Sequence, residues 1–216
     1  MSIMKGAGMR PVFRPAAIFR AGFVAIAALG LASCVSLGGA EPPPSLLTLT
    51  SDDALSSGVS IQSATKSAIR IFELETPAKI NINRVPVQVD ATEIAYLKDA
   101  IWVDKPARLF RSLVAETIRA RTSSFVIDGD DPGLKADGNL RGVIREFGYD
   151  ARNGSAIIRF DAVWTVGDGT TYTQRFESVQ PGVVAEAGPV ADALNDAAND
   201  VAGQLVSWIT GAGGAA

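Results

Sequence analysis

The chain contains no histidine and only one cysteine in 216 residues. Without histidine, Ser-His-Asp and Cys-His nucleophilic machinery is excluded, as is every zinc site that needs an imidazole ligand. A single cysteine excludes an internal disulfide bond. The remaining options are an activated lysine or tyrosine, or a carboxylate pair, but the acids Glu73, Glu75, Glu93 and Glu116 are dispersed along the chain. We therefore expect a protein that is not an enzyme and needs no cofactor.

Long hydrophobic runs are also scarce, and the one near the N-terminus is too short to span a membrane. Ala21–Leu31 contains only apolar or small residues, whereas a transmembrane helix needs about 20. Four basic residues and no acidic residue precede it, namely Lys5, Arg10, Arg14 and Arg20. This order is typical of a bacterial export signal. No second run of spanning length follows, so we expect a tethered protein and not a spanning one.

The export signal ends at the only cysteine. Leu31, Ala32 and Ser33 precede Cys34 and resemble the lipobox of bacterial lipoproteins. This motif predicts that residues 1–33 are a cleaved signal peptide and that Cys34 carries a diacylglycerol and an N-acyl chain, since one chain alone anchors only marginally. The alternative is a structural Cys34 behind an ordinary signal peptide, although a free thiol would be unusual in an exported protein.

Residues 34–44 form the predicted tether, which is rich in glycine and then stiffened by three prolines. Val35 follows the cysteine, and under the sorting rule of enteric bacteria it favours the periplasmic face of the outer membrane over the inner membrane. Cleavage removes four of the 20 basic residues and none of the 23 acidic ones, which leaves a net charge of −7. Such a charge argues against nucleic acid and against electrostatic docking on anionic lipid. We assign residues 45–210 to one domain and residues 211–216 to a flexible tail.

Alternating apolar residues predict the strands of the first half of the domain. They cover Ser45–Thr50, Ser67–Glu75, Arg84–Asp90, Glu93–Leu97, Ala100–Val103 and Ser123–Asp128. Pro86 suggests that its strand is an edge strand or is bulged. Lys98-Asp99 has the composition of a tight turn between two short strands.

Two amphipathic helices are predicted, one from an N-cap at Asp104 to about Arg121, the other from Pro189 to about Thr210. Between them, Asn153-Gly154 and Asp168-Gly169 separate three β-rich segments, which predicts an antiparallel meander. The expected fold class is α+β: a mostly antiparallel β-sheet with two amphipathic helices packed on one face.

Two other groups of residues are candidate sites. The acidic loop Asp128–Gly133 has Pro132 at position 5 and Asn139 at position 12 of a calcium loop, so we expect a solvated loop and no metal site. The tryptophans Trp102, Trp164 and Trp208 fall in apolar patterns that favour core packing. A shallow aromatic groove for an acyl chain is the alternative.

The segment from Lys79 to Ile118 carries a family resemblance. Its landmarks occur in a fixed order. Arg84 precedes a strand, an Ile-x-Tyr motif ending in Tyr96 lies ahead of Trp102, and a short acidic-Pro stretch then opens a helix. With the lipobox and the Leu-Leu-Thr-Leu segment, these landmarks make the chain similar to the ABC-type transport auxiliary lipoprotein family, which includes the paraquat-inducible protein C group. Val103-Asp104-Lys105-Pro106 departs from the Ala-Glu-Pro that members often show.

This resemblance implies a non-enzymatic auxiliary subunit of an MCE-type transporter that moves phospholipid or other hydrophobic molecules between the inner and outer membranes. Its partners would be a periplasmic MCE-domain protein, a permease and an ATPase. Arg84, Tyr96 and Trp102 would position the segment before the first helix and secondarily contact a partner. A homo-oligomer is possible if an edge strand such as Arg84–Asp90 pairs between subunits. A stand-alone periplasmic lipid-binding lipoprotein and an envelope assembly or structural lipoprotein are the alternatives.

Overall fold

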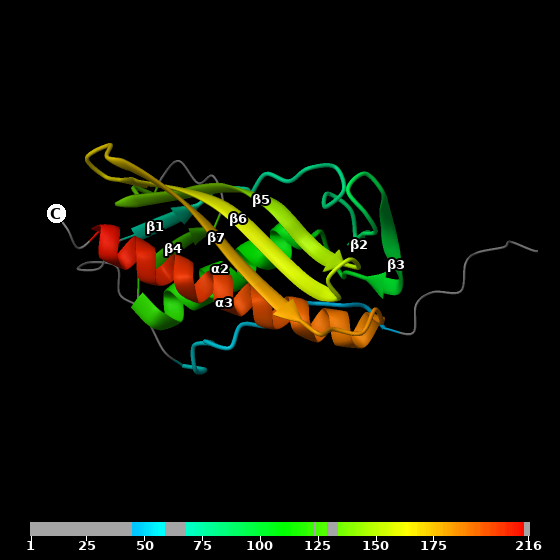
Figure 1. Cartoon of the computed structure of the whole chain (residues 1–216). Helices are drawn as coiled ribbons and strands as arrows, with labels where there is room; N and C mark the ends of the chain where they lie inside the picture. The colour runs from blue at the N-terminus through cyan, green and yellow to red at the C-terminus, as the bar shows by residue number, and fades with distance from the viewer. Residues whose placement is uncertain (1–44, 59–67, 123, 129–133, 214–216) are drawn as a thin grey trace, which may run out of the picture. The chain divides into compact units, whose positions relative to one another are not determined.

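The computed structural model describes residues 45–58, 68–122, 124–128 and 134–213, all within the compact unit Pro43–Ala216. Seven strands and two helices lie in these residues (Figure 1). They are β1 (Ala68–Ile71), β2 (Arg84–Gln88), β3 (Ile94–Ile101), α2 (Pro106–Thr122), β4 (Phe125–Asp128), β5 (Gly138–Asp150), β6 (Ser155–Val166), β7 (Thr171–Pro181) and α3 (Ala187–Gly213). The predicted α+β class with two helices is confirmed.

The sheet is mixed, and the prediction of a mostly antiparallel sheet was wrong. Along the path β3-β2-β5-β1-β4 among the described strands, the β2–β5, β1–β5 and β1–β4 pairings are parallel. The other edge of β5 carries β6 and then β7, and both pairings there are antiparallel. Because β5 has 13 residues, β1 and β2 can both pair with one of its edges, at opposite ends.

The meander of β5, β6 and β7 forms as its turn residues predict. Gly154 and Gly169 both have positive φ angles, of 60° and 92°, which the tight hairpin turns require. The β5–β6 ladder extends from the pair Gly138–Val166 to Asp150–Ser155, and it contains one bulge near Ile144. Successive turns thus set the register of three long strands.

The structure corrects three predictions for the short strands. Lys98-Asp99 is not a turn, because β3 is one continuous strand in which Asp99, with φ of 57°, lies in a bulge opposite β2. The strand β2 pairs with β3 on one side and β5 on the other, so Arg84–Asp90 is not an edge strand that could pair between subunits. In the predicted strand Ser45–Thr50, Leu47 makes only an isolated bridge with Trp102.

Both helices pack on the same face of the sheet and against each other (Figure 1). Pro106 opens α2, where a missing backbone N–H costs nothing, and Arg119 and Arg121 end it where the helix dipole favours cations. Asp104 accepts a hydrogen bond from the N–H of the next residue, Lys105, at 2.7 Å. A regular N-cap side chain bonds instead to the N–H two or three residues further along the helix. The apolar stripe of α3 is fully buried at Val190, Leu194, Ala197, Val201 and Leu205.

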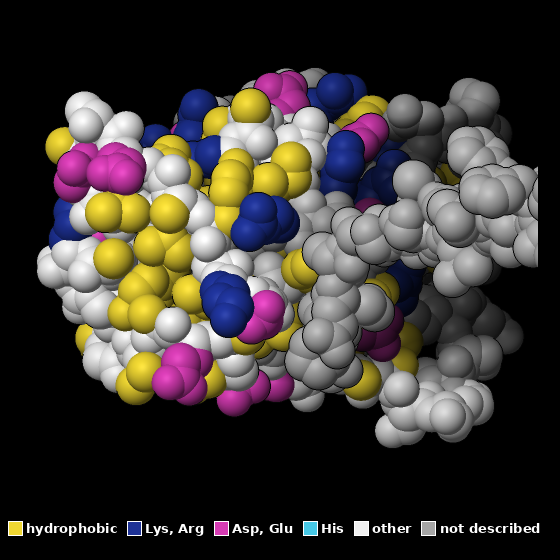
Figure 2. Space-filling view, turned by 90° about the vertical axis from the view of Figure 1, so that its right-hand side faces the viewer, with side chains coloured by type: hydrophobic (Ala, Val, Ile, Leu, Met, Phe, Trp, Pro, Cys, Tyr) yellow, Lys and Arg dark blue, Asp and Glu magenta, His cyan; other side chains and the backbone are white. Residues whose placement is uncertain are grey.

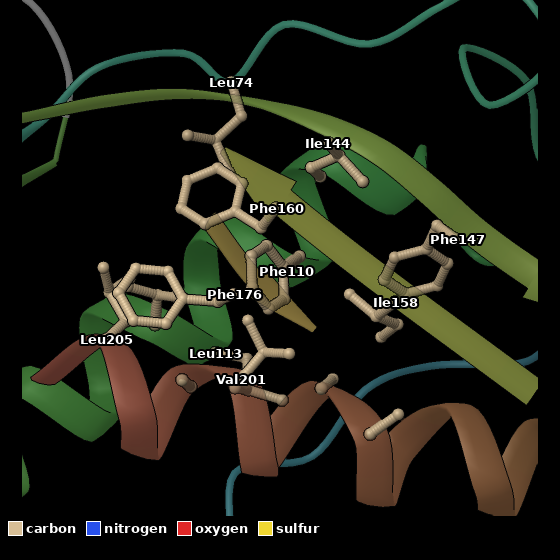
Figure 3. Packing of buried hydrophobic residues seen from close by; sticks show 14 of the residues in the cluster. Leu74, Phe110, Leu113, Ile144, Phe147, Ile158, Phe160, Phe176, Val201 and Leu205 are labelled. Atoms are coloured by element: carbon tan, nitrogen blue, oxygen red, sulfur yellow. The ribbon is translucent and has the colours of Figure 1, made fainter. Parts of the chain in front are cut away.

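The core lies between the helices and the sheet (Figure 3). Phe110 from α2 makes edge-to-face contacts with Phe147 of β5 and Phe160 of β6, with centroid distances of 6.4 and 5.5 Å. Trp102 packs edge-on against Phe147 at 5.7 Å. Such aromatic pairs contribute beyond the area they bury. The Phe110, Phe147 and Phe160 rings therefore connect the meander, α2 and the end of β3.

Candidate functional site

One face of the sheet is covered by the helices (Figure 1). The opposite face carries polar side chains. We call this second surface the outer face. In β7 the alternation is clear, since Phe176 and Ser178 are buried beneath α3 whereas Thr173, Arg175 and Val179 are exposed. A face that no helix covers is a candidate for contact with another molecule.

Five charged side chains of β5, β6 and β7 interact with one another on the outer face. Asp161 of β6 accepts hydrogen bonds from Arg175 Nε at 2.6 Å and from Arg145 Nε at 2.8 Å. These bonds, that from Arg175 first, hold the pKa of Asp161 well below its usual range. Arg159 pairs with Glu177 on the same strands. Each of these five charges has a partner, so these side chains form a solvated, ordered surface and show no unpaired group poised for proton transfer.

A hollow of about 190 Å³ lies on the outer face where β2 meets β5. Its walls include Lys79, which pairs with Glu146 at 2.6 Å, and Asp150, which accepts two hydrogen bonds from the guanidinium of Arg152 at 2.8 and 2.6 Å. The bonds from Arg152 lower the pKa of Asp150. Ile94 is 41% exposed at the rim. The hollow is small and polar, with one aliphatic edge.

The structure brings together two of the three residues singled out in the segment before the first helix. The Arg84 guanidinium carbon lies 5.1 Å from the centroid of the Tyr96 ring, within range of a cation–π interaction. Both side chains belong to the outer side of the β2–β3 hairpin, because Val85 and Leu97 point into the core. Trp102 is separated from them and is 1% exposed, on the core side.

Several other sequence-based predictions fall outside the described residues. They concern Leu31, Ala32, Ser33, the acylation of Cys34, and most of the acidic loop after Asp128. In the part of the chain that is described, no three Asp, Glu, Cys or His side chains gather as a metal site would require. Neither helix there combines the length and apolar character needed to cross a bilayer.

The N-terminal segment forms a polar attachment to both helices that sequence reasoning missed. The Thr50 N–H donates to Asn195 Oδ1 at 2.8 Å, and Asn199 Nδ2 donates to the Thr50 carbonyl at 2.9 Å. Asp53 pairs with Arg121 of α2 at 2.6 Å. The spacing of Asn195 and Asn199, one turn apart on α3, was the available signal. The segment that follows the predicted tether is thus fastened to the helical layer.

Comparison with known proteins identifies the family. Residues 48–206 match the model of the ABC-type transport auxiliary lipoprotein component. The chain belongs to this family. The resemblance inferred from Arg84, Tyr96 and Trp102 is therefore confirmed, and the protein is an auxiliary lipoprotein component of an ABC-type transporter. No curated protein matches the sequence.

Solved structures show the same fold at low sequence identity. A Xanthomonas campestris protein of the DUF330 family aligns with a TM-score of 0.66 and 17% identity, over 79% of this chain and 98% of that one. An uncharacterized protein aligns with a TM-score of 0.59 and 10% identity, over 76% and 99%. A PelC dodecamer from Paraburkholderia phytofirmans reaches a TM-score of 0.37 at 10% identity, over 66% and 91%, which is too low to support an argument. The fold of the auxiliary lipoprotein is thus shared by proteins of little sequence similarity.

Proposed function

We propose that this auxiliary lipoprotein is a lipid-anchored periplasmic subunit of an MCE-type transporter that moves phospholipid or other hydrophobic molecules between the inner and outer membranes. It acts by docking onto the periplasmic MCE-domain protein, while the permease and ATPase complete the machine and supply the energy. The family match over residues 48–206 carries the proposal. The MCE link, the outer-membrane location and the anchor at Cys34 are parts of this proposal.

The arrangement of side chains supports docking as the mode of action. The hollow at the β2–β5 junction, at about 190 Å³, is below the roughly 300–1,000 Å³ of ligand pockets. Two further hollows, of about 440 and 420 Å³, are shallow depressions open to solvent and do not enclose a ligand. Asp161, Arg145 and Arg175 on the outer face are mutually paired, which suits recognition by another protein better than catalysis. We place the protein contact on the outer face, since α2 and α3 cover the other side of the sheet.

The test is affinity purification of the full chain from detergent-solubilised envelopes. Cys34→Ala is the unanchored control, and mass spectrometry identifies proteins and lipids in the eluate. We expect the wild-type chain to recover the MCE-domain protein with the permease and ATPase, and to fractionate with outer membranes. Phospholipid without any transporter protein would contradict the docking role and favour a stand-alone lipid-binding lipoprotein.

Two matched variants locate the contact. Thr173→Trp places a large side chain on an exposed position of the outer face, and Gln204→Trp does the same on the exposed side of α3. We expect Thr173→Trp to reduce the recovered MCE-domain protein by roughly tenfold or more, as one clash in an interface core does. Gln204→Trp should recover it at the wild-type level. The reverse result would move the contact to the helical side.

A further inference from the structure

A surface patch lies at the end of β3, directly beside the first described residue. It consists of three aliphatic side chains and an arginine–tyrosine pair, and we call it the β3 patch. Its members are Leu46, Ile101, Val103, Arg84 and Tyr96. Figure 2 views the molecule from the side on which Figure 1 draws β3, and shows hydrophobic side chains on this surface beside Lys and Arg side chains.

Backbone pairing brings these residues together. The Leu47 N–H donates to the Ile101 carbonyl and the Val103 N–H donates to the Leu47 carbonyl, each at 2.8 Å. Trp102 points into the core, so its neighbours Ile101 and Val103 point outward, and Leu46 shares that side because Leu47 packs inward.

The arginine–tyrosine pair borders the aliphatic residues. Arg84 is the register partner of Ile101, and its guanidinium lies over the Tyr96 ring at 5.1 Å. Among the described residues, Arg84 forms no ion pair with a carboxylate. In contrast, the outer-face arginines Arg145, Arg159 and Arg175 all have acidic partners.

Two of the aliphatic residues are among the most exposed large hydrophobic side chains of the described residues, where only Val184 is more exposed. Leu46 is 54% exposed although the next residue, Leu47, packs against the core, and Val103 is 52% exposed although the preceding residue, Trp102, is buried. The nearest acid in the sequence, Asp104, is engaged by the Lys105 N–H at 2.7 Å and by Arg108 at 3.6 Å. The patch therefore combines accessible apolar surface with one available cation.

We infer that the β3 patch rests on the phospholipid surface to which the protein is anchored. This inference rests on the proposed function in one respect, namely that Cys34 is acylated. Ten residues separate Cys34 from Ser45, so this stretch spans at most about 40 Å, and the part of the domain nearest its end is the β3 patch. Because the tether enters the domain beside the β3 patch, this surface meets the membrane more often than surfaces farther from Ser45.

The chemistry of the patch fits a membrane interface. Leu46, Ile101 and Val103 would enter the boundary between headgroups and acyl chains, the Tyr96 ring would lie at headgroup level, and Arg84 would extend to lipid phosphate. The net charge of −7 disfavours attraction of the whole domain to anionic lipid. Contact therefore depends on the anchor and on apolar burial, and it orients the outer face with respect to the membrane.

The test uses the acylated full chain in vesicles of phosphatidylethanolamine and phosphatidylglycerol. Because Cys34 is the only cysteine and is acylated, Val103→Cys introduces a single thiol for an environment-sensitive fluorophore. Leu46→Cys is a second reporter in the β3 patch. Val179→Cys, at an exposed position of β7, is the matched control since Val179 is 45% exposed. Lipids with a nitroxide on the acyl chain serve as quenchers.

We expect the Val103 and Leu46 reporters to be quenched at least roughly twofold more than the Val179 reporter, because interfacial side chains lie about 5–10 Å into the bilayer boundary. Equal quenching at all three positions would overturn the inference. A blue shift of the fluorophore's emission at Val103 without quenching would also overturn it, because that result would indicate burial against a second copy of the chain. The vesicles contain no transporter, so this result is independent of MCE binding. An unacylated Cys34, detected by mass spectrometry, would overturn the anchor and this inference together.

Discussion

The strands of the sheet fall into two groups that are built in different ways. β5, β6 and β7 have 13, 12 and 11 residues, and tight turns join them in sequence. β1 and β2 have four and five residues and pair in parallel with the edge of β5 opposite β6. β4 then pairs with β1, and β3 pairs with β2. The long strands are specified by adjacent turns, whereas the short strands depend on contacts between distant parts of the chain.

The two groups meet at a small number of buried residues. Phe147 of β5 contacts Trp102, which follows β3, and Phe110 of α2. Gly148 lies beneath Pro86 of β2, on the other face of the same strand. The short strands are therefore held by packing on both faces of β5 near its end. Changes at these positions should separate the stability of the short strands from that of the meander.

Phe147→Ala should have the largest effect. Phe147 is fully buried and is joined to Trp102 and Phe110 by edge-to-face contacts, and removal of such a ring costs about 3–5 kcal/mol. Chemical denaturation of the mature chain with Cys34→Ala measures the free energy of unfolding. Val179→Ala, at a site that is 45% exposed, is the control and should change it by less than about 0.5 kcal/mol. A loss below about 1 kcal/mol at Phe147 would show that this junction is not central.

Gly148→Ala should have a smaller and more localised effect. A Cβ atom at this position would lie 2.3 Å from the Pro86 backbone carbonyl oxygen, so β2 must move away from β5. We expect a loss of about 1–3 kcal/mol, with amide hydrogen exchange accelerated in β2 and β3 more than in β6 and β7. Gly188→Ala is the control, because no atom lies within 4 Å of its added Cβ. Equal acceleration of amide hydrogen exchange in all strands of the sheet would contradict the view that the short strands and the meander differ in stability.

The same contrast explains which parts of the fold could be predicted from the sequence. Asn153-Gly154 and Asp168-Gly169 predict their hairpins because a short turn sets the register of the strands beside it. Lys98-Asp99 also has the composition of a turn, but the positive φ of Asp99 occurs in a bulge within β3. Local composition cannot distinguish a turn from a bulge. The pairing of Val87 with Tyr149 links residues 62 positions apart, and no local pattern predicts it.

The candidate site was predictable only in part, for the same reason. Arg84 and Tyr96 could be singled out as landmarks, and they do come into contact. Trp102 belongs to the same landmarks, but strand alternation turns it into the core. The hydrogen bonds that the N-terminal segment donates to Asn195 and Asn199 join residues more than 140 positions apart. Individual residues could be found from the sequence, but their grouping on one surface required the fold.

Asp161→Asn should have the smallest effect, within the meander alone. The partner side chains Arg145 and Arg175 are 52% and 60% exposed, so solvent screens the ion pairs and the expected loss at pH 7 is at most about 1 kcal/mol. Because hydrogen bonds from both arginines lower the folded-state pKa of Asp161 below its unfolded value of about 3.9, this contribution is present above about pH 4. It is lost as the pH falls further, through the folded-state pKa.

Denaturation of the wild-type chain and Asp161→Asn at pH 7 and pH 3 tests this expectation. The difference between the two free energies of unfolding should shrink at pH 3, and at pH 7 it should also shrink in 1 M salt, where the Debye length is about 3 Å. A difference that is unchanged by acid would mean that Asp161 stabilises the meander through geometry and not through charge. Exchange rates in β2 and β3 should not respond, because Asp161 pairs β6 with β5 and β7 only. Such a response would instead couple the outer-face charges to the short strands, and the two groups would then unfold as one unit.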